Sequence, residues 1–150
     1  MGIFDFLKSK KTIINHPFFG ELNFAGSKVN YFEGNTVFPP LNKIVEFVIS
    51  APIKGPSEEQ VNYFKNLSSS YGEIETQAKE IIEEEFRNWK EDFKIQDFQK
   101  EFNLVFISLP SLDSNSNEEL ELAFETKHDE NHTFTVHFKD LKAIHVNING

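Results

Sequence analysis

Histidines and carboxylates in the last quarter of the chain are the residues whose types and spacing could support chemistry. The run His128-Asp129-Glu130-Asn131-His132 places two histidines four residues apart, the spacing at which a helix presents two zinc ligands on one face. The segment is predicted to form a hairpin turn, where a step of four does not return to the same face. We interpret it as a solvated polar turn, with a metal site at His128 and His132 as the alternative.

A second group of candidates follows from the predicted pairing of the last strands. The apolar residues of 133–138 and of 144–148 all have even numbers. They lie on one face of an antiparallel pair only if each even-numbered residue is opposite another even-numbered residue, so that the two residue numbers have an even sum. A turn centred on Leu141 then places His137 opposite His145. A turn centred on Asp129 likewise places Glu121 opposite His137. These three side chains are predicted to form a row on the wet face, as a metal site, a pH-sensitive patch, part of a partner surface, or strand residues without a role.

Other familiar chemistries lack their signatures in this sequence. The absence of cysteine excludes disulfides, thiol nucleophiles and thiolate metal sites, and it is typical of proteins of the reducing cytoplasm. None of the glycines lies in a phosphate-binding G-x-G-x-x-G or G-x-x-x-x-G-K loop, and no serine lies in a G-x-S-x-G elbow. We expect no cofactor and favour a binding protein over an enzyme.

The charge balance bears on the kind of partner. The net charge is −9, from 24 acidic and 15 basic residues. Such a surface repels phosphate backbones, so nucleic-acid binding is not expected; it suits a basic protein partner, or it keeps the chain in solution. The candidate partner contacts are Glu80, Glu83 and Glu84 of a predicted helix, together with Glu121, His137 and His145.

Apolar periodicity predicts the elements that position these residues. Alternation predicts strands at 18–25, 28–33, 43–50, 104–109, 120–125, 133–138 and 144–149. A capping box formed by Ser57 and Gln60 begins one helix. A longer helix is predicted over 73–93, with Trp89 in its buried stripe. Gly34 is predicted to break the second strand.

The order of the elements predicts one α+β domain over residues 16–150. Its sheet is expected to be mainly antiparallel, with three N-terminal and four C-terminal strands and two central helices packed on one face. Residues 1–15 form a short amphipathic segment, which could dock on the domain itself or touch an anionic membrane surface through residues 1–11. No stretch is long and apolar enough for a membrane span.

Four short features together resemble a family. They are Phe19-Gly20-Glu21-Leu22, Tyr31-Phe32-Glu33-Gly34, Trp89 near a helix end, and a terminal hairpin with His132 that ends at Gly150. Their order is similar to that in uncharacterised bacterial domains of unknown function with an F-G-x-L start and a histidine-containing C-terminal hairpin. The sequence departs from that pattern at Glu130-Asn131, where an aromatic residue and glycine are expected. The resemblance implies an immunity-like role and brings no catalytic residues.

Three functions remain open from the sequence. The leading hypothesis is a non-enzymatic bacterial interaction protein of the cytoplasm, immunity-like, that binds a basic partner through an acidic surface. One alternative is a small metal-dependent hydrolase or other enzyme that uses a histidine/carboxylate cluster. The other is a peripheral membrane protein attached through residues 1–11.

Overall fold

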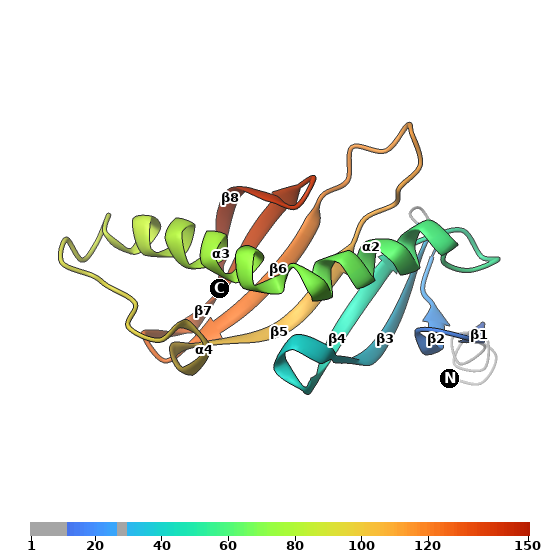
Figure 1. Ribbon diagram of the computed structural model, residues 1–150, viewed down its shortest axis with the longest axis horizontal. Coiled ribbons are helices and arrows are strands. Elements are labelled where there is room, and N and C mark those ends of the chain that lie inside the picture. Colours follow the sequence, from blue (N-terminus) through green and yellow to red (C-terminus); the bar gives the residue numbers. More distant parts are fainter. Residues whose placement is uncertain (1–11, 27–29) are drawn as a thin grey trace, which may run out of the picture.

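The computed structural model describes residues 12–26 and 30–150, which form one open β-sheet backed by helices (Figure 1). The order of the eight described strands across the sheet is their order along the chain. They are β1 (Ile13–His16), β2 (Gly20–Phe24), β3 (Tyr31–Phe38), β4 (Lys43–Ser50), β5 (Phe102–Leu109), β6 (Leu120–Thr126), β7 (Asp129–Lys139) and β8 (Lys142–Asn149). Neighbouring strands are antiparallel except β4 and β5, which are parallel.

The parallel pair is possible because a long helical connection joins β4 to β5. It contains α2 (Glu58–Ser69), α3 (Tyr71–Phe86) and the short α4 (Phe98–Glu101), while the 3-10 turn η1 (Pro39–Leu41) joins β3 to β4. In Figure 1, α2 and α3 cross one face of the sheet as a nearly continuous line. None of the described helices is long and apolar enough to cross a membrane, and residues 1–11 lie outside the described residues.

The predicted α+β class, with a mainly antiparallel sheet and helices on one face, is confirmed. The strands divide four and four rather than three and four, because β1 has no counterpart among the predicted strands. Its four residues, Ile-Ile-Asn-His, are too few to show an alternation. The boundary expected at residue 15 falls inside β1, which pairs with β2 along its whole length.

The start of α2 ties the helices to the parallel pair. The predicted capping box is confirmed. The backbone N–H of Gln60 donates to Ser57 Oγ (3.2 Å), and the backbone N–H of Ser57 donates to Gln60 Oε1 (3.0 Å). The buried Gln60 side-chain nitrogen then donates to the carbonyl oxygens of Ser50 (2.8 Å) and Pro110 (3.0 Å). One glutamine thus joins the ends of β4 and β5 to the first turn of α2.

Phenylalanine dominates the core between the sheet and the helices. On the helix side of the sheet, the fully buried side chains include Phe32, Phe38, Phe47, Phe124, Phe134 and Phe138. From α3, Phe86 stacks on Phe134 with ring centroids 5.0 Å apart. Full burial of a Phe side chain contributes about 1.5–3 kcal/mol, so these contacts account for much of the stability that holds the sheet against the helices.

The long helix ends earlier than predicted. α3 stops at Phe86 instead of continuing to residue 93, and the chain turns at Arg87–Lys90. Phe93 returns after the turn and stacks on Phe86 with centroids 4.3 Å apart, so it is buried without being helical. Trp89 was expected in the core, but it lies on the turn and is 56 % exposed, so that interpretation is wrong. The helical spacing of apolar residues up to Phe93 therefore did not predict the end of the helix, because Phe93 is buried by packing on Phe86 after the turn.

Gly34 does not end its strand, and β3 continues through it to Phe38. A Cβ atom at this position would lie 3.0 Å from Leu22 Cδ2, 3.1 Å from Phe47 Cε1 and 3.2 Å from the Glu21 carbonyl oxygen. The glycine is therefore explained by the close packing of β2, β3 and β4 on the core face, and not by a turn.

Candidate functional site

The predicted row of side chains is present on the face of the sheet that faces away from the helices. Glu121 pairs with His137 across β6 and β7, and His137 pairs with His145 across β7 and β8, so both predicted registers are confirmed. Their neighbours Leu122 and Val136 are buried on the helix side, and alternation turns the row outward. The two imidazole rings are stacked, with centroids 4.1 Å apart and planes at 18°.

The turn between β7 and β8 decides where His145 lies. Asp140 and Leu141 both have positive φ (50° and 61°), as in a two-residue type I′ turn. Gln77 of α3 holds this turn: its side-chain nitrogen donates to the Leu141 carbonyl (3.1 Å), and its oxygen accepts from the Ala143 N–H (2.7 Å). These bonds help to hold two non-glycine residues in a left-handed conformation, which costs roughly 1–2 kcal/mol per residue.

A register shift follows the turn and corrects one expected core residue. Phe138 pairs with Ala143 while His137 pairs with His145, which leaves Ile144 as an extra residue in β8. Ile144 was expected on the dry face with Val146 and Ile148, but it is 45 % exposed. A bulge of this kind re-aims side chains, and here it keeps His145 outward while Ala143 packs on the core.

Glu119 completes a cluster that sequence reasoning missed. Its Oε1 lies 3.3 Å from His137 Nδ1, and ligand atoms of Glu119, His137 and His145 all lie within 4.8 Å of one another. Glu119 precedes β6 by one residue, so extending the alternation of Glu121 backward by two positions would have placed both carboxylates on one face.

The other ring nitrogen of His137 has polar neighbours as well. The Asn147 amide nitrogen lies 3.0 Å from His137 Nε2, and Glu121 Oε1 lies 3.6 Å from it. An N–H from Asn147 to Nε2 places the ring proton on Nδ1, where it faces Glu119. The His137 side chain is only 12 % exposed, and a hollow of about 270 Å³ lined by Ser108, Glu119, Glu121 and His137 among others opens beside it. The cluster can therefore hold a proton or a cation at the edge of a small cavity.

The other two candidate histidines are not brought together. His128 turns toward the core, where its Nε2 lies 2.7 Å from Glu101 Oε1, and His132 faces solvent with its Nδ1 2.8 Å from Asp129 Oδ2. His128 lies in the turn between β6 and β7, whereas His132 lies within β7. The structure therefore brings His128 and His132 to different carboxylates instead of to a shared ligand position.

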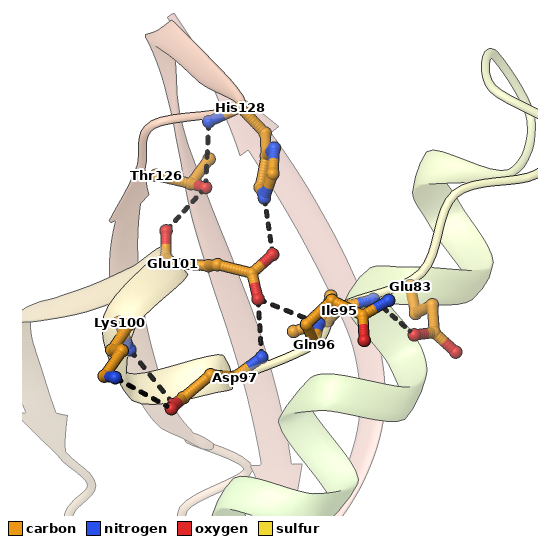
Figure 2. Close-up of polar contacts among 8 residues, drawn as sticks. All are labelled: Glu83, Ile95, Gln96, Asp97, Lys100, Glu101, Thr126 and His128. Carbon is orange, nitrogen blue, oxygen red and sulfur yellow. Dashed lines mark hydrogen bonds and ion pairs between the residues drawn. The ribbon is translucent and has the colours of Figure 1, made fainter.

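Glu101 is the centre of a closed polar network (Figure 2). Its Oε2 accepts from the backbone N–H groups of Gln96 (2.8 Å) and Asp97 (2.5 Å), while Oε1 faces His128. Thr126 Oγ1 donates to the Glu101 carbonyl (2.8 Å) and accepts from the His128 N–H (3.2 Å). With the side chain only 7 % exposed, both carboxylate oxygens have partners inside the protein.

The electrostatics of Glu101 reflect these bonds. Burial alone would raise the pKa of the Glu101 carboxyl, but the Asp97 N–H, His128 and the Gln96 N–H together hold that pKa below its usual value of 4.5. The ionised form is therefore the one the fold stabilises. Figure 2 also shows the Ile95 N–H donating to Glu83 (2.8 Å), so two carboxylates fasten the connection between α3 and α4.

The expected partner contacts lie on two opposite faces of the molecule. Glu80 and Glu84 are exposed on the outer surface of α3, whereas Glu121, His137 and His145 lie on the open face of the sheet. Glu83 is already engaged by Arg87 and by the Ile95 N–H. One partner surface cannot include all of these residues, because the sheet and the helices separate them.

The open face of the sheet combines acidic residues with an apolar centre. Strand pairing places Val48, Phe106 and Ala123 in the middle of the sheet on this face, between Glu33 and Glu46 on one side and the row on the other. Of these, Val48 and Phe106 are half-buried and Ala123 is buried, while exposed apolar residues lie farther along β3 and β4 at Val37 and Ile44, the latter 69 % exposed. The lysines of these strands lie at strand ends: Lys43, Lys139 and Lys142.

A hollow of about 490 Å³ lies elsewhere, between the end of β4, the start of α2 and the segment after β5. Gln60 is the buried polar residue beside it, and both hydrogens of its amide already bond to Ser50 and Pro110. Among the described residues no histidine lines this hollow, so it lies apart from the cluster in which the ionisable groups converge.

Comparisons with known proteins return no match to a protein-family model, to a curated protein or to a solved structure. The class is therefore defined by the fold alone: an α+β protein with an open, mostly antiparallel eight-stranded sheet and two main helices on one face. The resemblance to uncharacterised bacterial domains stays a prediction.

Proposed function

We propose that the protein is a non-enzymatic binding protein that binds a basic protein partner through the open face of its sheet. The observation that carries the proposal is the composition of that face, with the half-buried Val48 and Phe106 at its centre and glutamates around them. An apolar centre supplies contact area, and the surrounding carboxylates select a positively charged partner. The immunity-like role implied by the resemblance is one form of such binding.

Two glutamates of this face carry charge that no described cation pairs with. Glu33 and Glu46 occupy diagonal positions on β3 and β4, are both exposed, and make no ion pair with another described residue. Glu125 differs, because its charge acts on Lys43: burial lowers the pKa of that lysine, and Glu125 partly offsets the lowering. A partner that places lysine or arginine over Glu33 and Glu46 would therefore gain pairs that the protein lacks on its own.

Binding of a short synthetic peptide of alternating lysine and leucine, followed by NMR, tests the proposal. We expect amide shifts to be largest around Val48 and Phe106, and affinity to fall as salt screens the carboxylates. The double variant Glu33→Gln/Glu46→Gln should weaken binding roughly tenfold, since two surface pairs contribute about 0.7 kcal/mol each.

The matched control is Glu80→Gln/Glu84→Gln, which removes the same charge from the helix face. It should leave the affinity within about twofold of the wild type, since long-range effects of exposed charges are screened. Equal losses from the two double variants would show that only net charge attracts the peptide, and the proposed surface would be abandoned. Shifts confined to α3 would move the surface to the helix face.

A further inference from the structure

We propose a divalent transition-metal site, suited to Zn²⁺, formed by Glu119, His137 and His145 on the open face of the sheet. The site is separate from the proposed partner contacts at Glu33 and Glu46, which lie across the sheet on β3 and β4. Two imidazoles and one carboxylate are a ligand set that zinc accepts in proteins, and three protein ligands leave a fourth position open.

Distances between the ligand atoms support the assignment. In a tetrahedral zinc site each ligand atom lies about 2.0–2.1 Å from the ion, so two ligand atoms are about 3.3 Å apart. His137 Nδ1 and Glu119 Oε1 are 3.3 Å apart. An ion between them takes the place of the proton on Nδ1, without a movement of the strands.

The surroundings of His137 complete the arrangement. With the ion on Nδ1, the ring proton moves to Nε2, where the Asn147 side-chain amide at 3.0 Å turns its oxygen inward to accept it, and Glu121 Oε1 lies 3.6 Å away. A polar partner on the far nitrogen orients a metal-bound histidine, and a nearby carboxylate raises its basicity. Two carboxylates beside two neutral imidazoles also balance the charge of a divalent ion, which an isolated histidine pair does not.

His145 is the ligand that must adjust. Its ring is stacked nearly parallel to that of His137, and an ion can lie in the plane of only one of two parallel rings. His145 is exposed on the edge strand β8, so its ring is free to turn about χ2 until a nitrogen points at the ion. Ligand atoms that already lie within 4.8 Å of one another need only this rotation.

The open coordination position faces a cavity. The hollow of about 270 Å³ beside Glu119 and His137 is also lined by Ser108 and Glu121. Water or a small anionic ligand can occupy such a position on a zinc ion held by three protein ligands. The metal site therefore has an open coordination position. The hollow beside it is also lined by Leu109, Pro110 and residues 117–118.

Zinc titration of the full chain, followed by NMR of the histidine side chains and by calorimetry, tests the site. We expect one ion per chain, with large shifts of the His137 and His145 rings. His145→Ala should weaken zinc binding about 100-fold. Glu121→Gln, which acts on His137 and not on the ion, should weaken it roughly tenfold, the lower end of the range for such outer contacts.

His132→Ala is the control, because it removes another exposed histidine that also faces a carboxylate but lies at the opposite end of β7. It should leave the zinc affinity unchanged. Unmoved His137 and His145 signals at stoichiometric zinc would overturn the proposal. An equal loss from His132→Ala and His145→Ala would also overturn it, because binding would then be non-specific. Neither result depends on peptide binding at Glu33 and Glu46.

Discussion

Two histidine–carboxylate pairs on opposite faces of the sheet differ in how far their hydrogen bonds are satisfied. His128 and Glu101 lie on the helix side, where the carboxylate also accepts two backbone N–H groups and the imidazole packs edge-on against Phe93 at 5.0 Å. His137 and Glu119 lie on the open side beside a hollow, next to the exposed His145. The residue types are the same, and the surroundings are not.

The difference separates a structural pair from a candidate site. Around Glu101 each carboxylate oxygen has a partner within the protein, so a ligand would have to displace bonds that hold the connection from α3 to α4. Around His137 the neighbours are an exposed ring and two partly exposed carboxylates, which a cation can bind without unfolding anything. Residue type alone did not distinguish the two.

Removal of the Glu101 carboxylate should have the largest effect on stability. Glu101→Ala leaves two backbone N–H groups and His128 without their acceptor, and we expect a loss of about 3 kcal/mol in the free energy of unfolding. Glu119→Ala on the open face should change it by less than about 0.5 kcal/mol. Urea denaturation followed by circular dichroism measures both, and equal losses would erase the distinction between the pairs.

Substitution of His128 should also reduce stability more than substitution of His145. His128→Ala removes one partner of a carboxylate that keeps its two backbone donors, so we expect a smaller loss of about 2 kcal/mol. His145→Ala removes an exposed ring and should stay within about 0.5 kcal/mol of the wild type. A His145 variant as destabilised as the His128 variant would show that the stacked pair is structural.

The Glu101 network should also make stability depend on pH. The pKa of Glu101 is lowered in the folded state, so its ionised form contributes stability that is complete above the unfolded pKa near 4.5 and is lost as pH falls through the folded pKa. Glu101→Gln should therefore lie furthest below the wild type at neutral pH. The gap in unfolding free energy should narrow below pH 4.5, and a gap that widens there would contradict the assigned direction.

The smallest effect is expected at Trp89, on the connection that Glu83 and Glu101 fasten. Because the indole is 56 % exposed, Trp89→Ala should cost no more than about 0.5 kcal/mol, mainly its edge-on contact with Phe86 at 5.2 Å. In the folded wild type its fluorescence should be quenched readily by acrylamide. Strong protection from the quencher would place Trp89 in a buried setting, contrary to the structure.

Local sequence patterns correctly predicted those features of the structure that depend on residues close together in the chain. The even-sum rule predicted both Glu121–His137 and His137–His145, because one residue of slippage would expose Phe134 and Val136. The Ser57–Gln60 capping box was predicted for the same kind of reason, since its partners are three residues apart. Glu119 was within reach of the same alternation but was not included.

Several features that the sequence did not predict depend on contacts outside the local pattern. The residues near His128 do not predict its contact with Glu101, because the two are 27 residues apart and strands β5 and β6 lie between them. The end of α3 depends on Phe93 folding back on Phe86, and the exposure of Ile144 depends on a bulge beside the turn that Gln77 holds.

The sequence by itself determined which residues alternate between the two faces of each strand, since side-chain direction in a strand has a period of two whatever surrounds it. It therefore determined that Glu121, His137 and His145 share a face. Only the tertiary structure decided that this face lies away from α2 and α3, and that His128 meets Glu101. Burial and hydrogen-bond satisfaction are properties of packed neighbours, and the chain acquires those neighbours only when the sheet and the helices come together.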